Sequence, residues 1–390
     1  MPVPLVRAGG LAACALFISA LVPLSAQTTR PPELPPEVDP YTCGEPERLA
    51  LLGYRSFGPF LFGPAANEIV QARLGKVPIL WVETEHFRLG SALAEYRPEL
   101  PEEIAELRGE LEELHERLAS FPLKPKKLDP WLRLHLFAWR LERLHADFCA
   151  RLGVRELGTG AGATRPPGPT IMVGDKFAVL LTQKKSTLAR FTAEYCGQER
   201  DDSWFYNFSA TRSLFFGLSD ESLDLTDSDL HYALVYGATQ ILLMGINGFP
   251  RALPSWWQNG VALWFARERE PRVLLYAKPQ VEGLPTEELA DWEPLVRGRV
   301  EVGAVLGWGE MLARRSCFGQ PFGDSIVLWS RIDYFMRRQG AAPPLVSALH
   351  DPGRRLDSRE ALAQATGTSL DALDAAWQAW VKETYRKKRR

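Results

Sequence analysis

Apolar residues recur at helical spacing in two long segments of the first half of the chain. Pro101 opens the first segment, where an apolar residue returns every three or four positions at Ile104, Leu107, Leu111, Leu114 and Leu118. Proline at the start of such a stripe is typical of an amphipathic helix. A second stripe stops at Gly153, a residue favoured just beyond a helix end, and consists of Phe137, Leu141, Leu144, Phe148 and Leu152. The pattern therefore predicts two consecutive helices.

Runs rich in β-branched and aromatic residues predict strands on both sides of these helices. The longest run covers residues 79–89, and shorter runs cover residues 170–173, 204–208 and 213–218. Glycine and proline separate several of the runs, as expected for turns between strands. The first part of the chain is therefore expected to mix strands with helices.

Beyond residue 270 the pattern is helical only. We expect Asp324 or Ser325 to cap one helix that ends at Gly340, and residues 368–371 to form a capping box at the start of another. Strands mixed with helices early and helices alone late indicate an α+β protein rather than a repeated strand–helix–strand unit. We therefore predict a small mixed sheet with helices packed around it, followed by a mainly helical C-terminal lobe.

The N-terminus has the pattern of a secretory signal peptide. Arg7 is the only charged residue among the first 29, and the apolar stretch 11–21 is too short to span a bilayer. Ala26 closes an acceptable cleavage site. We therefore predict export to the periplasm or the extracellular space.

The remaining chain divides into three sections by composition. Residues 27–75 combine a proline-rich tether with a segment rich in glycine and proline that has no clear period, so we expect an irregular extension. We assign residues 76–270 to the α+β lobe. We assign residues 271–390 to the helical lobe, which ends in a basic tail.

Charge, hydropathy and cysteine content narrow the expected partners. The formal net charge is −2, which gives no general reason to expect nucleic acid. No later segment is long and apolar enough to predict a transmembrane helix. Cleavage would leave Cys43, Cys149, Cys196 and Cys317, which could form two disulfides in an oxidising compartment or remain buried thiols. Both alternatives stay open on the sequence.

The middle of the chain carries the most informative pattern. A helix is predicted at residues 230–244, and acidic residues crowd at its start, where they complement the helix dipole. Tyr232, Tyr236 and Gln240 recur every four residues on this helix and share one face. A second predicted helix contains the run WWQNGVA at residues 256–262.

These two helices resemble the helix pair of the gluzincins, the peptidase-MA-like zinc metallopeptidases. There a first helix carries HExxH, whose histidines face one metal while the glutamate activates water, and a second helix carries the third ligand in a WxxEGxA pattern. Aligned on these patterns, Tyr236 and Gln240 stand at the histidine positions, Gly237 at the general base and Asn259 at the third ligand. The resemblance covers residues 80–386.

The resemblance implies a metallopeptidase scaffold with a degenerate site. Tyrosine, glutamine and asparagine offer Zn²⁺ no thiolate, imidazole or carboxylate, and glycine cannot accept a proton. We therefore expect no metal, no cofactor and no catalytic residue at these positions. A relocated metal site is not expected either, because none of the six histidines stands at ligand spacing from another. These are His86, His115, His135, His145, His231 and His350.

The function that follows is that of a noncatalytic, exported peptidase-like protein. It would bind a peptide or another ligand or protein partner in the former substrate cleft, or serve a structural role in the envelope. We expect residues 213–218 to supply the edge strand that aligns an extended peptide. Candidates for the cleft lining are Ser213, Phe215, Leu218, Tyr232, Trp256 and Trp257.

The alternative is a hydrolase or another enzyme with an active site that no motif reveals. An open groove with several convergent titratable groups would favour this enzyme. A former cleft that is filled by tyrosine would favour the structural role.

Overall fold

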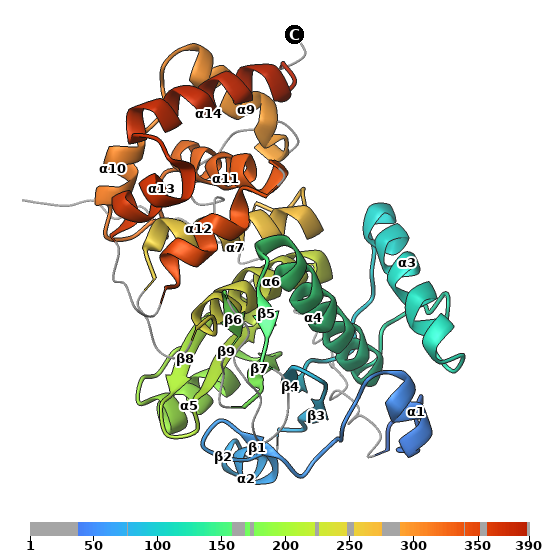
Figure 1. Ribbon diagram of the computed structural model, residues 1–390. Helices are drawn as coiled ribbons and strands as arrows, with labels where there is room; N and C mark the ends of the chain where they lie inside the picture. Colours follow the sequence, from blue (N-terminus) through green and yellow to red (C-terminus); the bar gives the residue numbers. More distant parts are fainter. Residues whose placement is uncertain are drawn as a thin grey trace, which may run out of the picture. The chain divides into compact units, whose positions relative to one another are not determined.

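The computed structural model describes residues 38–75, 77–157, 168–171, 175–222, 226–247, 253–274, 289–338, 340–351 and 357–387. The elements are labelled in Figure 1. They combine helices with a five-stranded mixed sheet, and a mainly helical region follows, so the predicted α+β class is confirmed. No helix within these ranges is both long and apolar enough to cross a membrane.

The central sheet has the strand order β3-β4-β7-β9-β8. β3 (Leu80–Glu83) and β8 (Trp204–Phe208) lie at the two edges, and each is antiparallel to its neighbour. The inner strands β4 (Phe87–Ala92), β7 (Phe177–Thr182) and β9 (Ser213–Ser219) run parallel to one another. Every residue of β7 and β9 is buried, as expected for parallel strands covered on both faces.

The strand predicted at residues 79–89 is a hairpin. Thr84 follows β3 and bonds across the turn to Phe87: the Thr84 N–H donates to the Phe87 carbonyl at 2.8 Å, and the Phe87 N–H donates to the Thr84 hydroxyl at 3.1 Å. The continuous run of β-forming residues concealed this turn. No pattern predicted β7 or α5 (Lys185–Cys196), because a fully buried strand shows no alternation.

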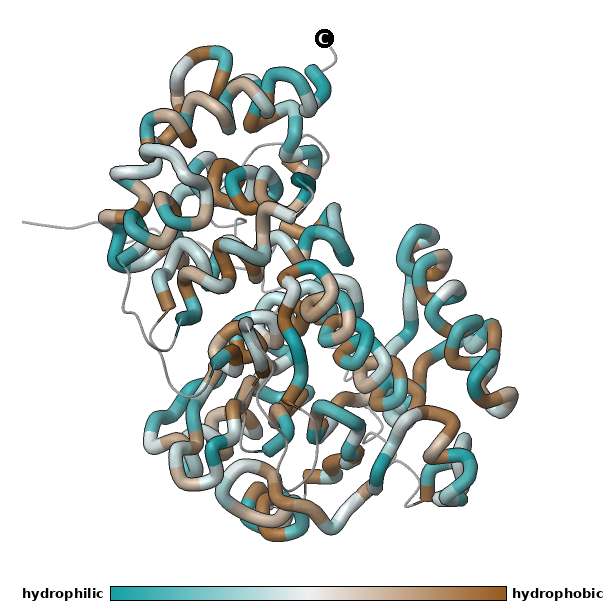
Figure 2. Tube along the Cα trace, in the orientation of Figure 1, coloured by the Kyte–Doolittle hydropathy of each residue, from teal (hydrophilic) through white to brown (hydrophobic). Residues whose placement is uncertain are grey.

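The two predicted helices of the first half are present as α3 (Pro101–Arg117) and α4 (Pro130–Leu152). Gly153 ends α4 in the left-handed conformation at φ +64°. Figure 2 shows hydrophilic and hydrophobic residues alternating along α3. α4 contacts β4 and α6 (Asp227–Met244), and α6 in turn packs against β9 and α7 (Ser255–Arg269). These contacts place α6 between α4, the sheet and α7.

The segment 41–75 holds regular structure, so the expected irregular extension is wrong. It forms α1 (Pro46–Leu51), a two-stranded sheet of β1 (Leu61–Phe62) and β2 (Ala65–Ala66), and α2 (Asn67–Arg73). Phe62 and Val70 are fully buried in an apolar cluster with Trp81 and Phe215. Elements this short leave no period in the sequence, and packing against the sheet holds them instead. The predicted signal peptide and most of the tether lie outside the described residues.

The C-terminal region contains α9 (Trp292–Glu301), α10 (Trp308–Ala313), α11 (Phe322–Arg337), α12 (Ala342–Leu349), α13 (Ser358–Thr366) and α14 (Leu370–Thr384). The Ser369 side chain caps α14 by accepting from the Ala372 N–H, so a cap is present within the predicted segment but not as the capping box of residues 368–371. The predicted cap of α11 by Asp324 or Ser325 is wrong, because α11 starts after Pro321 without a side-chain cap. Asp324 instead forms an ion pair with Arg314 at 2.7 Å.

The four cysteines of the described residues, Cys43, Cys149, Cys196 and Cys317, are unpaired. Cys196 and Cys317 are buried, and burial raises the pKa of Cys196 to about 12. A thiol with such a pKa stays protonated and unreactive at neutral pH. The structure therefore agrees with the alternative of free thiols.

Candidate functional site

Helices α6 and α7 hold the four positions that the gluzincin resemblance singles out. α6 begins with a capping box in which Thr226 and Asp229 accept from each other's backbone N–H. α7 packs against α6 and α11, and Gly260 permits the close approach of α11, because a side-chain carbon there would lie 2.7 Å from Ile332. Apolar packing therefore fixes the geometry of the helix pair.

Tyr236 and Asn259 meet across the helix pair. The Tyr236 hydroxyl donates to Asn259 Oδ1 at 2.5 Å. The Asn259 amide nitrogen donates to the Ser255 carbonyl at 2.9 Å and to the Ser255 hydroxyl at 3.0 Å. Tyr236 and Asn259 are 6% and 8% exposed. The two positions converge as the alignment requires, and the neutral side chains satisfy each other.

Gly237 and Gln240 complete the aligned set. A side-chain carbon at Gly237 would lie 2.0 Å from the ring of Phe216, which comes from β9. The aromatic ring thus occupies the space next to Gly237 into which a larger side chain would extend. Gln240 is buried on α6, but no hydrogen bond of the described residues joins it to Tyr236 or Asn259. Of the three aligned ligand positions, hydrogen bonding within the described residues therefore joins Tyr236 and Asn259.

The predicted cleft-lining residues are core residues. Tyr232, Trp256, Trp257, Ser213, Phe215 and Leu218 are all 2% exposed or less. The Trp256 indole N–H donates to the Ser358 hydroxyl at 2.9 Å, and the Trp257 indole N–H donates to His350 at 3.0 Å. These two tryptophans fasten α7 to the C-terminal helices. The prediction that they line an open cleft is therefore wrong.

The predicted edge strand is also in the wrong place. Residues 213–218 belong to β9, which pairs with β7 on one side and with β8 on the other. All its backbone positions face a neighbouring strand, so it cannot add an extended peptide. Among the residues that the structure describes, the unpaired edge on this side of the sheet belongs to β8, and α6 contacts β8 as well as β9.

A separate cleft of about 270 Å³ gathers ionisable side chains from α3, α4, the start of α6 and the end of α7. Asp227 pairs with Arg140 at 2.7 Å and with Arg133 at 3.2 Å, and Arg140 also pairs with Glu110 at 2.7 Å. His231 Nδ1 lies 2.8 Å from Glu270 Oε1. Titratable groups therefore do converge in a groove, although not at the aligned metal positions.

His231 and Glu270 are held as a neutral pair. Burial, reinforced by the charge of Arg140, lowers the pKa of His231 to about 3. Burial raises the pKa of Glu270 to about 8 against the opposing charge of Arg140. At neutral pH the imidazole is therefore unprotonated and the carboxyl group protonated, although the two groups lie at ion-pair distance.

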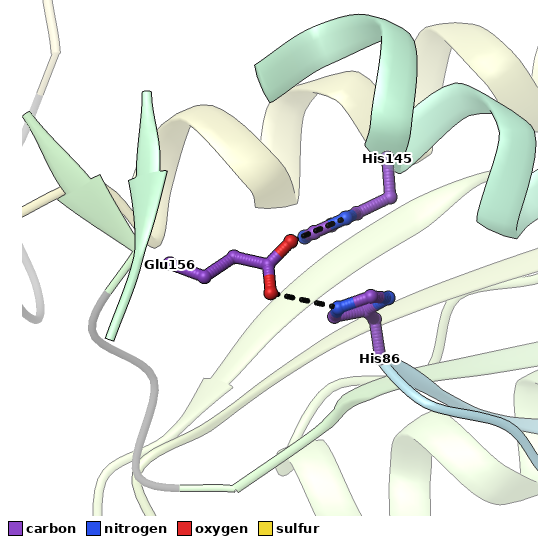
Figure 3. A group of neighbouring side chains, drawn as sticks. All are labelled: His86, His145 and Glu156. Carbon is purple, nitrogen blue, oxygen red and sulfur yellow. Dashed lines mark ion pairs between the residues drawn. The ribbon is translucent and has the colours of Figure 1, made fainter. Parts of the chain in front are cut away.

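A third polar group joins His86, His145 and Glu156, which come from the turn before β4, from α4 and from β5 (Arg155–Glu156). Figure 3 shows Glu156 reaching toward both imidazoles. His86 Nε2 lies 3.3 Å from one Glu156 oxygen, and His145 Nδ1 lies 3.7 Å from the other. The two rings are stacked with their centroids 3.7 Å apart. No spacing in the sequence predicted this group, because only the packing of α4 on β4 brings its histidines together.

The surroundings shift the pKa values of the two histidines in opposite directions. Burial lowers the pKa of His86, but the hydrogen bond and the charge of Glu142 outweigh it, so that the pKa lies above its usual value. Burial and the charge of His86 lower the pKa of His145 to about 4.

Comparison with models of protein families finds none that matches this chain, and comparison with curated proteins finds no match either. Arguments about function therefore rest on the chemistry of these three groups of residues.

Proposed function

We propose that this chain is an exported, noncatalytic peptidase-like protein that binds an extended peptide along the free edge of β8. The observation that carries this proposal is the 2.5 Å hydrogen bond between the Tyr236 hydroxyl and Asn259 Oδ1. In the gluzincins that the helix pair resembles, these positions hold an imidazole and a carboxylate on one zinc ion. Here two neutral side chains use their polar atoms on each other and leave no anionic ligand for the ion.

The position of the general base supports the same conclusion. Gly237 has no group that accepts a proton, and the ring of Phe216 lies where its side chain would begin. A glutamate could not enter this space unless the ring moved. The chemistry of peptide hydrolysis therefore lacks both its metal and its base at the aligned positions.

The edge of β8 supports peptide binding. Within the described residues no strand pairs with its outer side. Phe205 is 38% exposed, and two buried polar atoms on β8, the Trp204 indole nitrogen and the Asn207 side-chain oxygen, have no hydrogen-bond partner there. An unpaired edge presents N–H and C=O groups that an extended peptide can pair with, and neighbouring side chains can add selectivity. The signal-peptide pattern supports export.

Selection of random peptides displayed on phage tests this proposal. We expect enriched peptides to bind purified protein and to slow hydrogen exchange of the β8 amides at residues 204–208. Phe205→Asp should weaken binding at least tenfold, because it puts a charge on the edge strand. Val302→Asp is the matched control, since Val302 is an apolar residue that is 77% exposed in the C-terminal region.

Two results would contradict the proposal. One is a selection that enriches no peptide over a panning without protein. The other is a set of binders whose affinity is unchanged by Phe205→Asp, or which protect amides other than those of β8.

The second candidate is an enzyme whose site is the cleft with His231 and Glu270. The observation that favours it is the separation of the two pKa values, since a protonated glutamic acid and a neutral imidazole in one cleft can act as acid and base. The neighbouring charged side chains form ion pairs with one another, Arg140 with both Asp227 and Glu110. Such pairing is typical of a structural network and favours the binding protein over the enzyme. Turnover of chromogenic esters, amides or glycosides that Glu270→Gln abolishes would favour the enzyme over the binding protein.

A further inference from the structure

Three elements that are distant in sequence bring metal-binding groups to one point. His86 stands in the turn before β4, His145 on α4 and Glu156 on β5, and one donor atom of each lies within 4.8 Å of the others (Figure 3). Two imidazoles and one carboxylate are the donor set of many catalytic zinc sites. This group is separate from the helix pair α6–α7 and does not depend on the proposed function.

The distances to Glu156 match those between ligands of a small divalent ion. Donors that are each about 2.0–2.2 Å from a tetrahedral zinc ion lie about 3.3–3.5 Å apart. His86 Nε2 is 3.3 Å from Glu156 Oε2, and His145 Nδ1 is 3.7 Å from Glu156 Oε1. The separations of the donor atoms therefore fit one ion, and the orientations of the rings must still change.

Glu142 orients His86 for this role. Its Oε2 lies 2.6 Å from His86 Nδ1, and its Oε1 accepts from the His86 backbone N–H at 2.9 Å and from the Thr84 hydroxyl at 2.5 Å. A histidine that ligates a metal through one nitrogen usually donates its other N–H to a carboxylate or carbonyl group. Glu142 therefore fixes the tautomer that leaves Nε2 turned toward Glu156.

Binding requires the two rings to leave their stack. The ring planes are 14° apart, whereas nitrogen lone pairs lie in the ring plane and must point at one ion. The χ2 torsion of histidine is broad, so the ring can rotate without leaving its allowed range. Because Glu142 holds His86, we expect His145 and the half-exposed Glu156 to make the adjustment.

We propose that His86, His145 and Glu156 bind one divalent transition-metal ion of the zinc class, and that Glu142 positions His86. Glu156 is 53% exposed, so water reaches the ion and completes its coordination. Two nitrogen ligands and one oxygen ligand select zinc, cobalt or nickel over calcium and magnesium, which prefer oxygen alone.

Titration of chelator-treated protein with Zn²⁺ and Co²⁺ tests the proposal. We expect one equivalent of either ion, and visible Co²⁺ absorption bands typical of four or five ligands without a thiolate charge-transfer band. Competition with a chromophoric chelator gives the affinity. Glu156→Gln and His86→Gln should each lower it at least tenfold, and Glu142→Gln should lower it by about 10–100-fold through loss of the orienting carboxylate.

His115→Gln and Glu113→Gln are the matched controls, because both residues lie on α3 and the exposed Glu113 pairs with Arg143 instead. They should leave the affinity unchanged. Circular dichroism checks that each variant folds, and the exposed Glu156 makes its variant the safest. Absence of saturable binding, or an affinity that Glu156→Gln does not change, overturns the proposal. Cys149 Sγ lies 4.0 Å from His145 Nε2, so a Co²⁺ spectrum that Cys149→Ser alters would show that the thiol ligates the ion and would overturn the proposed donor set.

Discussion

In the helix pair α6–α7 the polar side chains meet as neutral partners, whereas in the cluster of His86, His145 and Glu156 they meet as ionisable groups with metal-binding chemistry. Tyr236 and Asn259 come from two adjacent helices at motif spacing and hydrogen-bond each other. The cluster has no motif spacing, and its residues come from a turn, a helix and a short strand. The first region follows a motif spacing without offering metal donors, and the second offers donors without a motif spacing.

This difference shows that the backbone of a site and its chemistry depend on different residues. Gly260, the packing of α7 on α11 and the two tryptophans of α7 hold the helix pair in place. Donor atoms, in contrast, converge wherever packing brings suitable side chains together. The motif spacing therefore describes the arrangement of two helices, and the donor atoms have to be located from the tertiary structure.

The largest expected effect is at Gly237 of the helix pair α6–α7, where an added side-chain carbon would lie 2.0 Å from the Phe216 ring. Gly237→Ala should lower the free energy of unfolding by about 3 kcal/mol, because the new carbon would overlap the ring of Phe216. Gly109→Ala is the matched control in α3, where a side-chain carbon meets nothing within 4 Å, and it should raise stability by up to about 1 kcal/mol. Urea unfolding measures both values.

A Phe216→Ala background identifies the cause. If the ring excludes side chains from position 237, the cost of Gly237→Ala should become small once the ring is removed. Equal costs in both backgrounds would mean that position 237 is not closed by Phe216, and the region could then accommodate a base.

A second effect, of about 2 kcal/mol, tests whether the helix pair holds His231 and Glu270 neutral. The folded pKa of Glu270 is about 8 against 4.5 in the unfolded chain, and that of His231 is about 3 against 6.5. Between pH 6.5 and 8 the folded protein binds one proton more at this pair than the unfolded chain does. The free energy of unfolding therefore falls as pH rises. Between pH 4.5 and 3 the unfolded chain binds one proton more, so stability falls as pH drops.

Glu270→Gln should remove the loss on the alkaline side only. Between pH 6.5 and 8 the free energy of unfolding of the unmodified protein should fall by about 2 kcal/mol more than that of the variant. The exposed Glu113→Gln should keep the full loss. If the free energy of unfolding changes equally with pH in Glu270→Gln and in the unmodified protein, the Glu270 carboxyl group is charged in the folded protein. The contrast between neutral partners at α6–α7 and ionisable groups in the cluster would then be lost.

Local patterns predicted the elements that carry their own signal. The stripes of α3 and α4, the Gly153 stop and the strand β8 all follow from residues close in sequence. The spacing of Tyr236 and Asn259 also follows from two adjacent helices. Local patterns could not predict which distant segments pair. The interior position of β9 in the sheet is one example.

The same limit applies to the candidate metal site. His86, His145 and Glu156 have ordinary neighbours in sequence, and their proximity depends on how α4 packs on β4 and on where β5 runs. The burial of Trp256 and Trp257 likewise depends on the C-terminal helices that cover α7. A residue type suggests what a side chain can do, and only tertiary packing decides which partners it has.

The smallest effects provide the sharpest test of the comparison, because they should separate stability from metal binding. Tyr236→Phe removes the donor to Asn259 Oδ1 and should lower the free energy of unfolding by about 1 kcal/mol, while its zinc affinity stays that of the unmodified protein. Glu156→Gln should show the reverse. Its free energy of unfolding should stay within about 0.5 kcal/mol of that of the unmodified protein, because the residue is half-exposed, and its zinc affinity should fall at least tenfold. Each variant is measured by urea unfolding in chelator and by competition for Zn²⁺. If Tyr236→Phe weakened zinc binding, the helix pair itself would hold the metal, and the neutral hydrogen bond would not describe the working state of the site.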